Sequence, residues 1–353
     1  MATMIEQFQE VNPQIEAVLA AHEARSNSPI DPLKALAEAA KMPDSRDILE
    51  IGPVVRESYE QRLKVLEETG LDIRPVLAAS YLVNLLTEDN LPHYTKTIDQ
   101  VARHSEPLSA FLNRWTAEED SHGVMLRDYG LMTGLIAAKK GAIVDYQQYQ
   151  DGRVSQLIAG TEITIQSLAQ GFAYTALQED ATNAAHRVEA GFFDPIGRRI
   201  TNRIAGDESN HHRAYSSMAA TMLDAFPDET VVAIRDQFHN FSMPGQIGIP
   251  GFKELATTIA VAGLFDEATI VRLQNKQLGP KYWNIENRQF STDEAKIAQE
   301  ELLIGDPKSE KRIRILEKIR DKSLANASRN PDSRKPFILG RTISTDELMQ
   351  LAA

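Results

Sequence analysis

The stretch Trp115-Thr-Ala-Glu-Glu-Asp-Ser-His-Gly123 places Glu119 three residues before His122. On an α-helix, residues i and i+3 lie on the same face, so this carboxylate and this imidazole can reach one point in space. A carboxylate and an imidazole that converge in this way suit an iron or manganese ion. The stretch therefore predicts a helix that carries half of a metal site.

The same spacing recurs in Asp207-Glu-Ser-Asn-His-His-Arg-Ala-Tyr215, where Glu208 precedes His211 by three residues. Two such helices facing each other would hold two metal ions. The spacing alone has little weight, because the chain has eight His and 50 acidic residues in 353, and Asp236 with His239 is a third instance. About one such pair is expected by chance, so the argument depends on the surrounding sequence.

Two isolated glutamates complete the pattern. A carboxylate-bridged dimetal site in a four-helix bundle takes one Glu from each of two helices and a Glu-x-x-His pair from each of the other two. Glu88 lies 31 residues before Glu119, and Glu179 lies 29 residues before Glu208. Both lie in apolar or small-residue stretches, where an unpaired carboxylate is costly to bury. The 60 residues between Glu119 and Glu179 leave room for a long crossover, so we predict an all-α, ferritin-like four-helix bundle with additional helices.

Four stretches, in this order, resemble the soluble acyl-acyl-carrier-protein desaturases, the stearoyl-type enzymes (fatty acid desaturase type 2). They are Thr87-Glu-Asp-Asn-Leu-Pro-His-Tyr94, Trp115 to Gly123, Gln178-Glu-Asp-Ala-Thr182 and Asp207 to Tyr215. The resemblance extends roughly over residues 75–340. It implies a diiron oxidoreductase of fatty acid metabolism that introduces a double bond into a long acyl chain. It further implies the use of O2 and two electrons from a ferredoxin-type donor, an acyl carrier protein as partner, and a homodimer.

The resemblance also implies which residues hold two iron ions per chain. The ligands would be Glu88, Glu119, His122, Glu179, Glu208 and His211. Glu88 is preferred to its neighbour Asp89 because the first acidic residue matches the family. Thr182, three residues after Glu179, would place a catalytic hydroxyl on the oxygen-binding side of the irons. A bond from this hydroxyl back to its own helix is an equally good interpretation.

Residues beside the predicted ligands invite separate interpretations. Trp115 packs in the core, lies near the metal centre, or does both. Glu118 is rotated away from Glu119 and is predicted to point elsewhere, and His212 is predicted to be a bystander for the same reason. Asp207 could hydrogen-bond a ligand imidazole.

The rest of the chain divides into three predicted parts. Residues 1–45 form a helical arm with a packing or dimer-contact role, residues 46–323 form the diiron domain, and residues 324–353 form a tail with few packing signals. Pro92 should kink or end the helix that carries Glu88. Residues 134–150 fit a further helix and a connection.

Composition limits the possible functions. An apolar content of 42% with 25% charged residues is typical of a globular protein. No apolar run approaches the length of a membrane span, and no secretory signal is recognisable, so we predict a cytoplasmic protein. The chain has no Cys and therefore cannot build an iron–sulfur cluster of its own. Its net charge of −12 argues against nucleic acid as a partner.

An acidic carrier protein would need a local basic surface on this acidic chain. The densest basic segment is Lys308 to Lys322, with seven basic and three acidic residues. Its candidate docking residues are Lys311, Arg312, Arg314, Lys318 and Arg320. The segment that is basic in plant members reads Asp236-Gln-Phe-His-Asn-Phe241 here, and only Trp115 and Trp283 are present, so the plant electron-relay Trp has no counterpart.

Two alternatives to the desaturase stay open at this point. One is a diiron oxidase or hydroxylase with the same site and another substrate, such as an acyl-CoA or a natural-product intermediate. The other is a ferritin-like protein that binds metal without acyl turnover. An apolar channel beside the metal site would favour the acyl enzyme over both.

Overall fold

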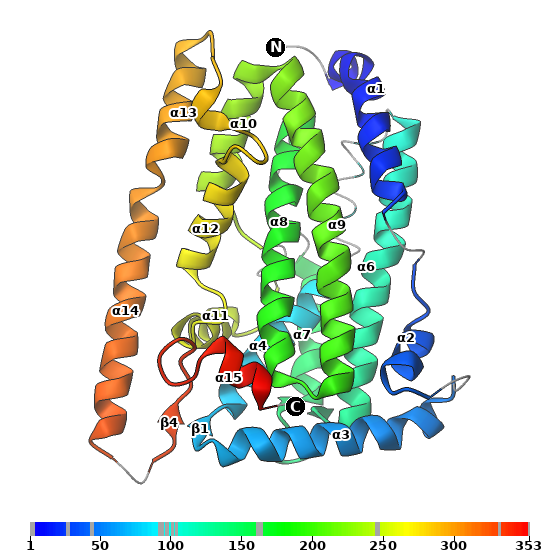
Figure 1. The fold of residues 1–353 in the computed structure, drawn as a ribbon, viewed down its shortest axis with the longest axis vertical. Helices are drawn as coiled ribbons and strands as arrows, with labels where there is room; N and C mark the ends of the chain where they lie inside the picture. The colour runs from blue at the N-terminus through cyan, green and yellow to red at the C-terminus, as the bar shows by residue number, and fades with distance from the viewer. Residues whose placement is uncertain are drawn as a thin grey trace.

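The computed structural model describes residues 4–25, 29–42, 46–90, 95, 99, 102, 105–159, 165–243, 248–330 and 333–351. Four helices form a central bundle: α4 (Arg74–Glu88), α6 (Glu106–Thr133), α8 (Leu168–Glu189) and α9 (Pro195–Ala225) (Figure 1). Each packs against two of the others around a closed square. The prediction of an all-α, four-helix core is confirmed.

Capping residues fix where three of these helices begin. The side chains of Ser105, Ser167 and Asp194 accept hydrogen bonds from backbone N–H groups in the first turns of α6, α8 and α9. Such caps satisfy N–H groups that have no partner within the helix. Pro195 follows the Asp194 cap directly and is the first residue of α9, a position where its missing N–H costs nothing.

The bundle consists of two hairpins, α4/α6 and α8/α9, joined by a long crossover, which is the connectivity of ferritin-like bundles. The crossover holds β2 (Ile136–Ala137), β3 (Val144–Asp145) and α7 (Tyr146–Ala159), and the two short strands pair in parallel. The predicted helix therefore begins only at Tyr146. Gly134 and Gly141, with φ of 75° and 88°, stop α6 and turn the chain between the strands.

Further helices surround the bundle. They are α1 (Met4–Glu23), α2 (Pro32–Ala39), α3 (Ile48–Glu68), α10 (Pro227–His239), α11 (Phe252–Val261), α12 (Glu267–Leu278), α13 (Asp293–Ile304), α14 (Pro307–Ser328) and α15 (Thr345–Gln350). Two 3₁₀ turns, η1 (Ala190–Phe192) and η3 (Ile285–Asn287), and the strands β1 (Leu71–Asp72) and β4 (Lys335–Pro336) complete the elements. In Figure 1, α3 crosses the lower end of the bundle and α14 forms one outer edge of the molecule. Among the described helices, none is both long and apolar enough to cross a membrane.

The C-terminal segment packs more closely than its sequence suggests. Strand β4 pairs with β1, and Phe337, Ile338 and Leu348 are buried. Arg62 of α3 donates a 2.9 Å hydrogen bond to the carbonyl oxygen of Leu348. These short apolar groups show no periodicity, so the sequence carries few signals for the packing that is observed here. The boundaries of the three parts of the chain stay a prediction, and Pro92 lies outside the described residues.

Two apolar clusters fill the interior, and a polar layer separates them. Trp115 of α6 and Ala214 of α9 belong to one cluster. Met125 of α6 and Ile204 of α9 belong to the other. The turns between these positions carry the two Glu-x-x-His pairs. Because buried charge is costly without compensation, this layer is the place in the fold where a counter-charge is required.

Candidate metal centre

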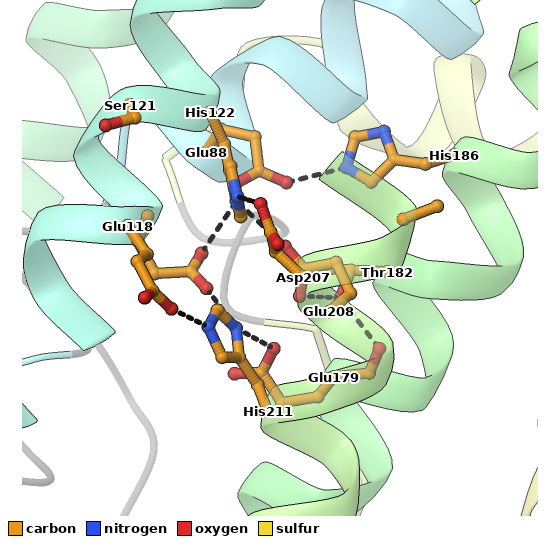
Figure 2. Close-up of polar contacts among 12 residues, drawn as sticks. Glu88, Glu118, Ser121, His122, Glu179, Thr182, His186, Asp207, Glu208 and His211 are labelled. Atoms are coloured by element: carbon orange, nitrogen blue, oxygen red, sulfur yellow. Dashed lines mark hydrogen bonds and ion pairs between the residues drawn. The ribbon is translucent and has the colours of Figure 1, made fainter. Parts of the chain in front are cut away.

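All six residues predicted as ligands lie together inside the bundle. Figure 2 labels each of them except Glu119. They form two groups: Glu88, Glu119, His122 and Glu208, and Glu119, Glu179, Glu208 and His211. Within each group, one oxygen or nitrogen atom per residue lies within 4.8 Å of the others. Every one of these residues is at most 3% exposed. Two groups that share Glu119 and Glu208 could hold two neighbouring metal ions.

The atoms facing the middle of the site have the character of metal ligands. His122 Nδ1 lies 3.0 Å from Glu208 Oε1, and His211 Nδ1 lies 2.9 Å from Glu119 Oε1. Neither imidazole nitrogen makes a hydrogen bond of adequate geometry with a described residue, and Oε1 of Glu119 and of Glu208 and Oε2 of Glu179 also lack one. Buried polar atoms without partners are rare in folded proteins. This set of nitrogen and oxygen atoms therefore fits a pair of metal ions of the iron or manganese type.

The pKa shifts of the central residues also indicate a site that suits bound cations. Burial raises the pKa of Glu88 to about 7. Burial and the nearby carboxylates of Glu208 and Glu119 raise the pKa of Glu179 well above its usual range. Burial alone would lower the pKa of His211, but hydrogen bonding with Glu118 and other carboxylates raises it well above normal. Protons thus compensate the crowded carboxylates, and bound cations would do so in their place.

The outer nitrogen of each imidazole meets an acidic residue from the other hairpin. His211 Nε2 lies 2.8 Å from Glu118 Oε2, and His122 Nε2 lies 3.6 Å from Asp207 Oδ2. Asp207 therefore lies beside His122, but at 3.6 Å the predicted hydrogen bond to this imidazole is not formed. The prediction that Glu118 points elsewhere is wrong. Glu118 is rotated by about 100° from Glu119 around α6. This rotation points its side chain toward α9, where His211 lies.

An arginine four residues earlier on the same helix holds each of these outer acids. Arg114 Nε lies 3.2 Å from Glu118 Oε1, and Arg203 Nε lies 3.1 Å from Asp207 Oδ2. Both pairs have the i,i+4 spacing at which helical side chains meet. Each imidazole is thus backed by a carboxylate and each carboxylate by a guanidinium, an arrangement that fixes the orientation of metal-binding histidines.

His186 of α8 is a site residue that the sequence reasoning missed. Its Nε2 lies 2.8 Å from Glu88 Oε1, and its Nδ1 lies 3.9 Å from Glu189 Oε2. Glu189 in turn accepts hydrogen bonds from Ser80 Oγ (3.1 Å) and Asn84 Nδ2 (2.7 Å). The signal was present, because His186 follows Glu179 by seven residues and so lies two turns along the same helix face.

Trp115 and Thr182 each fit both interpretations given above. Trp115 Nε1 donates a 3.1 Å hydrogen bond to Glu179 Oε1, while its ring packs edge-on against Tyr215. Thr182 Oγ1 lies 2.9 Å from Glu208 Oε2 and also 3.1–3.2 Å from two backbone carbonyl oxygens of its own helix. His212 lies outside both groups and contacts Gln277.

The N-terminal helix α1 covers the His211 side of the centre. His22 is buried, and its ring centroid lies 6.1 Å from that of His211. Burial lowers the pKa of His22 to about 4, so it adds no charge at neutral pH. Glu23 reaches Arg114 at 3.4 Å. Helix α1 therefore packs next to the site, and whether the arm also makes a dimer contact stays a prediction.

A cavity of about 260 Å³ opens beside the Glu88 side of the centre. Glu88 and Thr182 form part of its wall. Most of the remaining wall is apolar and includes Val83, Met243, Phe252, Ile259, Leu264, Phe265 and Ile270. Helices α4, α8, α11 and α12 contribute these residues, together with Met243 and the loop between α11 and α12. An apolar ligand could therefore lie within reach of the carboxylates.

Comparison with known proteins agrees with this description. The model of the fatty acid desaturase family matches residues 16–337. A protein of Mycobacterium tuberculosis named as an acyl-acyl-carrier-protein desaturase, DesA1, is 28% identical over 284 residues, covering 78% of this chain and 79% of its own length. The chloroplastic stearoyl-acyl-carrier-protein 9-desaturase 1 of Arabidopsis thaliana is 27% identical over 311 residues, covering 81% and 73%.

Among solved structures, the acyl-ACP desaturase DesA2 of Mycobacterium tuberculosis is 20% identical, with a TM-score of 0.47 over 71% of this chain and 98% of that chain. The family assignment depends on the sequence match, which covers most of the chain, including all six residues of the centre. The chain belongs to the fatty acid desaturase family.

Proposed function

We propose that this protein is a diiron acyl-acyl-carrier-protein desaturase that introduces a double bond into a long acyl chain. One observation carries the proposal: six buried carboxylate and imidazole side chains converge beside an apolar cavity whose wall includes Glu88 and Thr182. A metal store needs the first feature but not the second. The family match and the names of the relatives support the same assignment.

The proposed ligands of two iron ions are Glu88, Glu119, His122, Glu179, Glu208 and His211. Bound iron would supply the activation of O2 that removes one hydrogen from each of two adjacent carbons. The overall reaction converts a saturated carbon pair, O2, two electrons and two protons into a double bond and two water molecules. Its stereochemistry and position along the chain would follow from how the cavity holds the substrate.

The protein's own side chains would orient the participants. Glu118 holds the His211 imidazole and His186 holds Glu88, while Asp207 lies 3.6 Å from the outer nitrogen of His122. The apolar wall would exclude water and align the acyl chain next to the centre. Thr182 borders the cavity, and its Oγ1 donates a hydrogen bond to Glu208 Oε2. The hydroxyl proton would therefore be held between these two oxygen atoms.

Electron supply and assembly form part of the proposal. The chain has no Cys, so no iron–sulfur cluster can be built from it. We therefore expect the two electrons to come from a separate ferredoxin-type donor. A homodimer and a cytoplasmic location stay predictions from the sequence.

The function can be tested by expressing the protein in a bacterium whose own long fatty acids have no double bond at the positions that are assayed. Wild-type protein should produce new monounsaturated fatty acids, and the His211→Ala variant, expressed to the same level, should not. Hydroxylated acids would identify a hydroxylase. An unchanged fatty acid profile, despite iron-loaded protein and a working ferredoxin with its reductase, would contradict the proposal.

A further inference from the structure

Helix α14 presents one exposed face made of lysines and isoleucines. The residues recur every three or four positions, so they lie along one side of the helix. They are Lys308, Lys311, Ile315, Lys318, Ile319 and Lys322, and we call them the α14 basic face. Ile315 is 47% exposed and Ile319 is 40% exposed. An apolar centre flanked by cations is the composition of a surface that binds an acidic, partly apolar partner.

The acidic residues of α14 lie on other sides of the helix and are already paired. Arg341 contacts both Glu317 and Asp321, and Arg314 lies 3.4 Å from Glu310. The four lysines of the α14 basic face have no ion-pair partner among the described residues. Their charge is therefore uncompensated, in a protein whose net charge is −12, and this local field would attract acidic partners.

Two arginines counted as docking residues from the sequence also contact the α11/α12 region. Arg320 is 9% exposed, lies 2.6 Å from Asp266 and donates to the carbonyl oxygens of Ala260 and Val261. Arg312 lies 3.1 Å from Glu267. Both therefore connect α14 to the α11/α12 region. Arg320 is buried, so its assignment to docking is wrong, whereas Arg312 is exposed and its docking role stays a prediction.

These anchors connect α14 to the cavity. Asp266 and Glu267, the partners of Arg320 and Arg312, belong to the cavity wall together with Glu88 and Thr182. Ser309 also contacts Glu267. The α14 basic face lies on the exposed side of the helix, away from the buried Ser309 and Arg320. A partner seated on it would thus contact a helix whose other side is anchored to the cavity wall.

We propose that the α14 basic face docks the acyl carrier protein that delivers the substrate, an inference that rests on the proposed function. Carboxylates of the carrier would meet Lys308, Lys311, Lys318 and Lys322, and apolar side chains would cover Ile315 and Ile319. The anchoring of α14 to the cavity wall favours a carrier over an anionic lipid surface or an acidic electron donor, because only the carrier has to deliver an acyl chain to the cavity.

Direct binding tests this proposal without requiring turnover. The Lys311→Glu/Lys318→Glu/Lys322→Glu variant should bind acyl carrier protein with a saturated long acyl chain about tenfold more weakly at low ionic strength, and the difference should shrink with added salt. Fluorescence anisotropy of labelled carrier measures this affinity. Replacing Ile315 and Ile319 with Ser should weaken binding with the salt dependence unchanged.

A matched control reverses three exposed lysines elsewhere: Lys64 on α3, and Lys139 and Lys140 near β2. It makes the same change in net charge and should bind the carrier like wild type. In turnover assays, the α14 variant should show a raised KM for the acyl carrier protein with unchanged kcat and iron content, whereas the control should show neither effect.

Three results would overturn the proposal. The first is wild-type affinity of the α14 variant for the carrier. The second is an α14 variant that still binds the carrier but no longer binds phosphatidylglycerol vesicles or is no longer reduced by ferredoxin. The third is a wild-type protein that binds no carrier but desaturates acyl-CoA. Carrier binding as predicted, together with no desaturation, would instead locate the failure in the proposed reaction.

Discussion

The two hairpins of the bundle contribute equal sets of groups to the centre but position them differently. Each supplies two carboxylates and one imidazole: Glu88, Glu119 and His122 from α4/α6, and Glu179, Glu208 and His211 from α8/α9. The outer partner of each imidazole comes from the opposite hairpin, at 2.8 Å for His211 and 3.6 Å for His122. Neither half can therefore orient its own imidazole, so the site forms only when the hairpins pack together.

The isolated glutamates differ more. Glu88 is the last residue of α4, whereas α8 continues for ten residues beyond Glu179. The extension of α8 carries His186, which bonds Glu88, and Trp115 of α6 bonds Glu179. The shorter helix thus depends on an imidazole from the longer one. Position within a helix, rather than residue type, decides which neighbour orients each carboxylate.

The largest effect should follow from removing either imidazole. His211→Ala and His122→Ala should each lose most of the roughly two irons per chain that a six-residue dinuclear site implies. Helicity should stay close to wild type, because helix packing supplies most of the stability. Iron analysis with circular dichroism checks both, and full iron retention in either variant would refute the ligand assignment.

His212→Ala is the matched control for His211→Ala, since the two residues are adjacent and His212 lies outside both groups. It should keep its iron. A loss equal to that of His211→Ala would mean that disruption of α9, rather than loss of a ligand, explains both results.

Helical spacing and residue type indicated the two Glu-x-x-His pairs and the bundle, and the family resemblance completed the set of six, including the choice of Glu88 over Asp89. The i,i+3 rule brings Glu119 to His122 without knowledge of any other helix. Glu118 was misjudged because the same rule gives its direction on α6 but not which helix it meets there. His186 had the correct periodicity, yet nothing local indicates that its partner, Glu88, lies 98 residues away.

The outer partners of the imidazoles should have the next largest effect. Glu118→Ala removes a 2.8 Å contact with His211 and should weaken iron binding by about 10–100-fold, as is typical for residues that orient metal ligands. Asp207→Ala removes a contact of 3.6 Å and should weaken it less. Competition with a chelator measures both affinities. Equal losses of iron affinity in the two variants would show that the two imidazoles depend equally on their outer carboxylates.

Supports of the isolated glutamates can be compared in the metal-free protein. His186→Ala leaves the buried Glu88 without its bonded neighbour and should lower the free energy of unfolding by about 1–3 kcal/mol. Trp115→Phe keeps an aromatic ring and removes one hydrogen bond to Glu179, so a loss of about 1 kcal/mol is expected. Urea unfolding followed by circular dichroism gives both values. A larger loss for Trp115→Phe than for His186→Ala would contradict the inference that Glu88 depends more on its neighbour than Glu179 does.

The smallest effects should come from the arginines behind the outer acids, where the halves also differ. Arg203 pairs with Asp207 near the surface, whereas Arg114 pairs with both Glu118 and Glu23 of α1. Replacing either arginine with Ala should cost about 0.2–1 kcal/mol of unfolding free energy, because both are partly exposed.

Only Arg114→Ala should also loosen α1, since no hydrogen bond or ion pair joins Arg203 to that helix among the described residues. Hydrogen exchange of the α1 amides should therefore rise in Arg114→Ala and stay at the wild-type rate in Arg203→Ala. Helix α1 brings His22 against His211, so greater opening of α1 exposes the His211 half of the centre to water. Faster exchange confined to α1, with α3 unchanged, would identify the arm as a cover for that half; unchanged exchange in both variants would reduce Glu23–Arg114 to a surface pair with no such role.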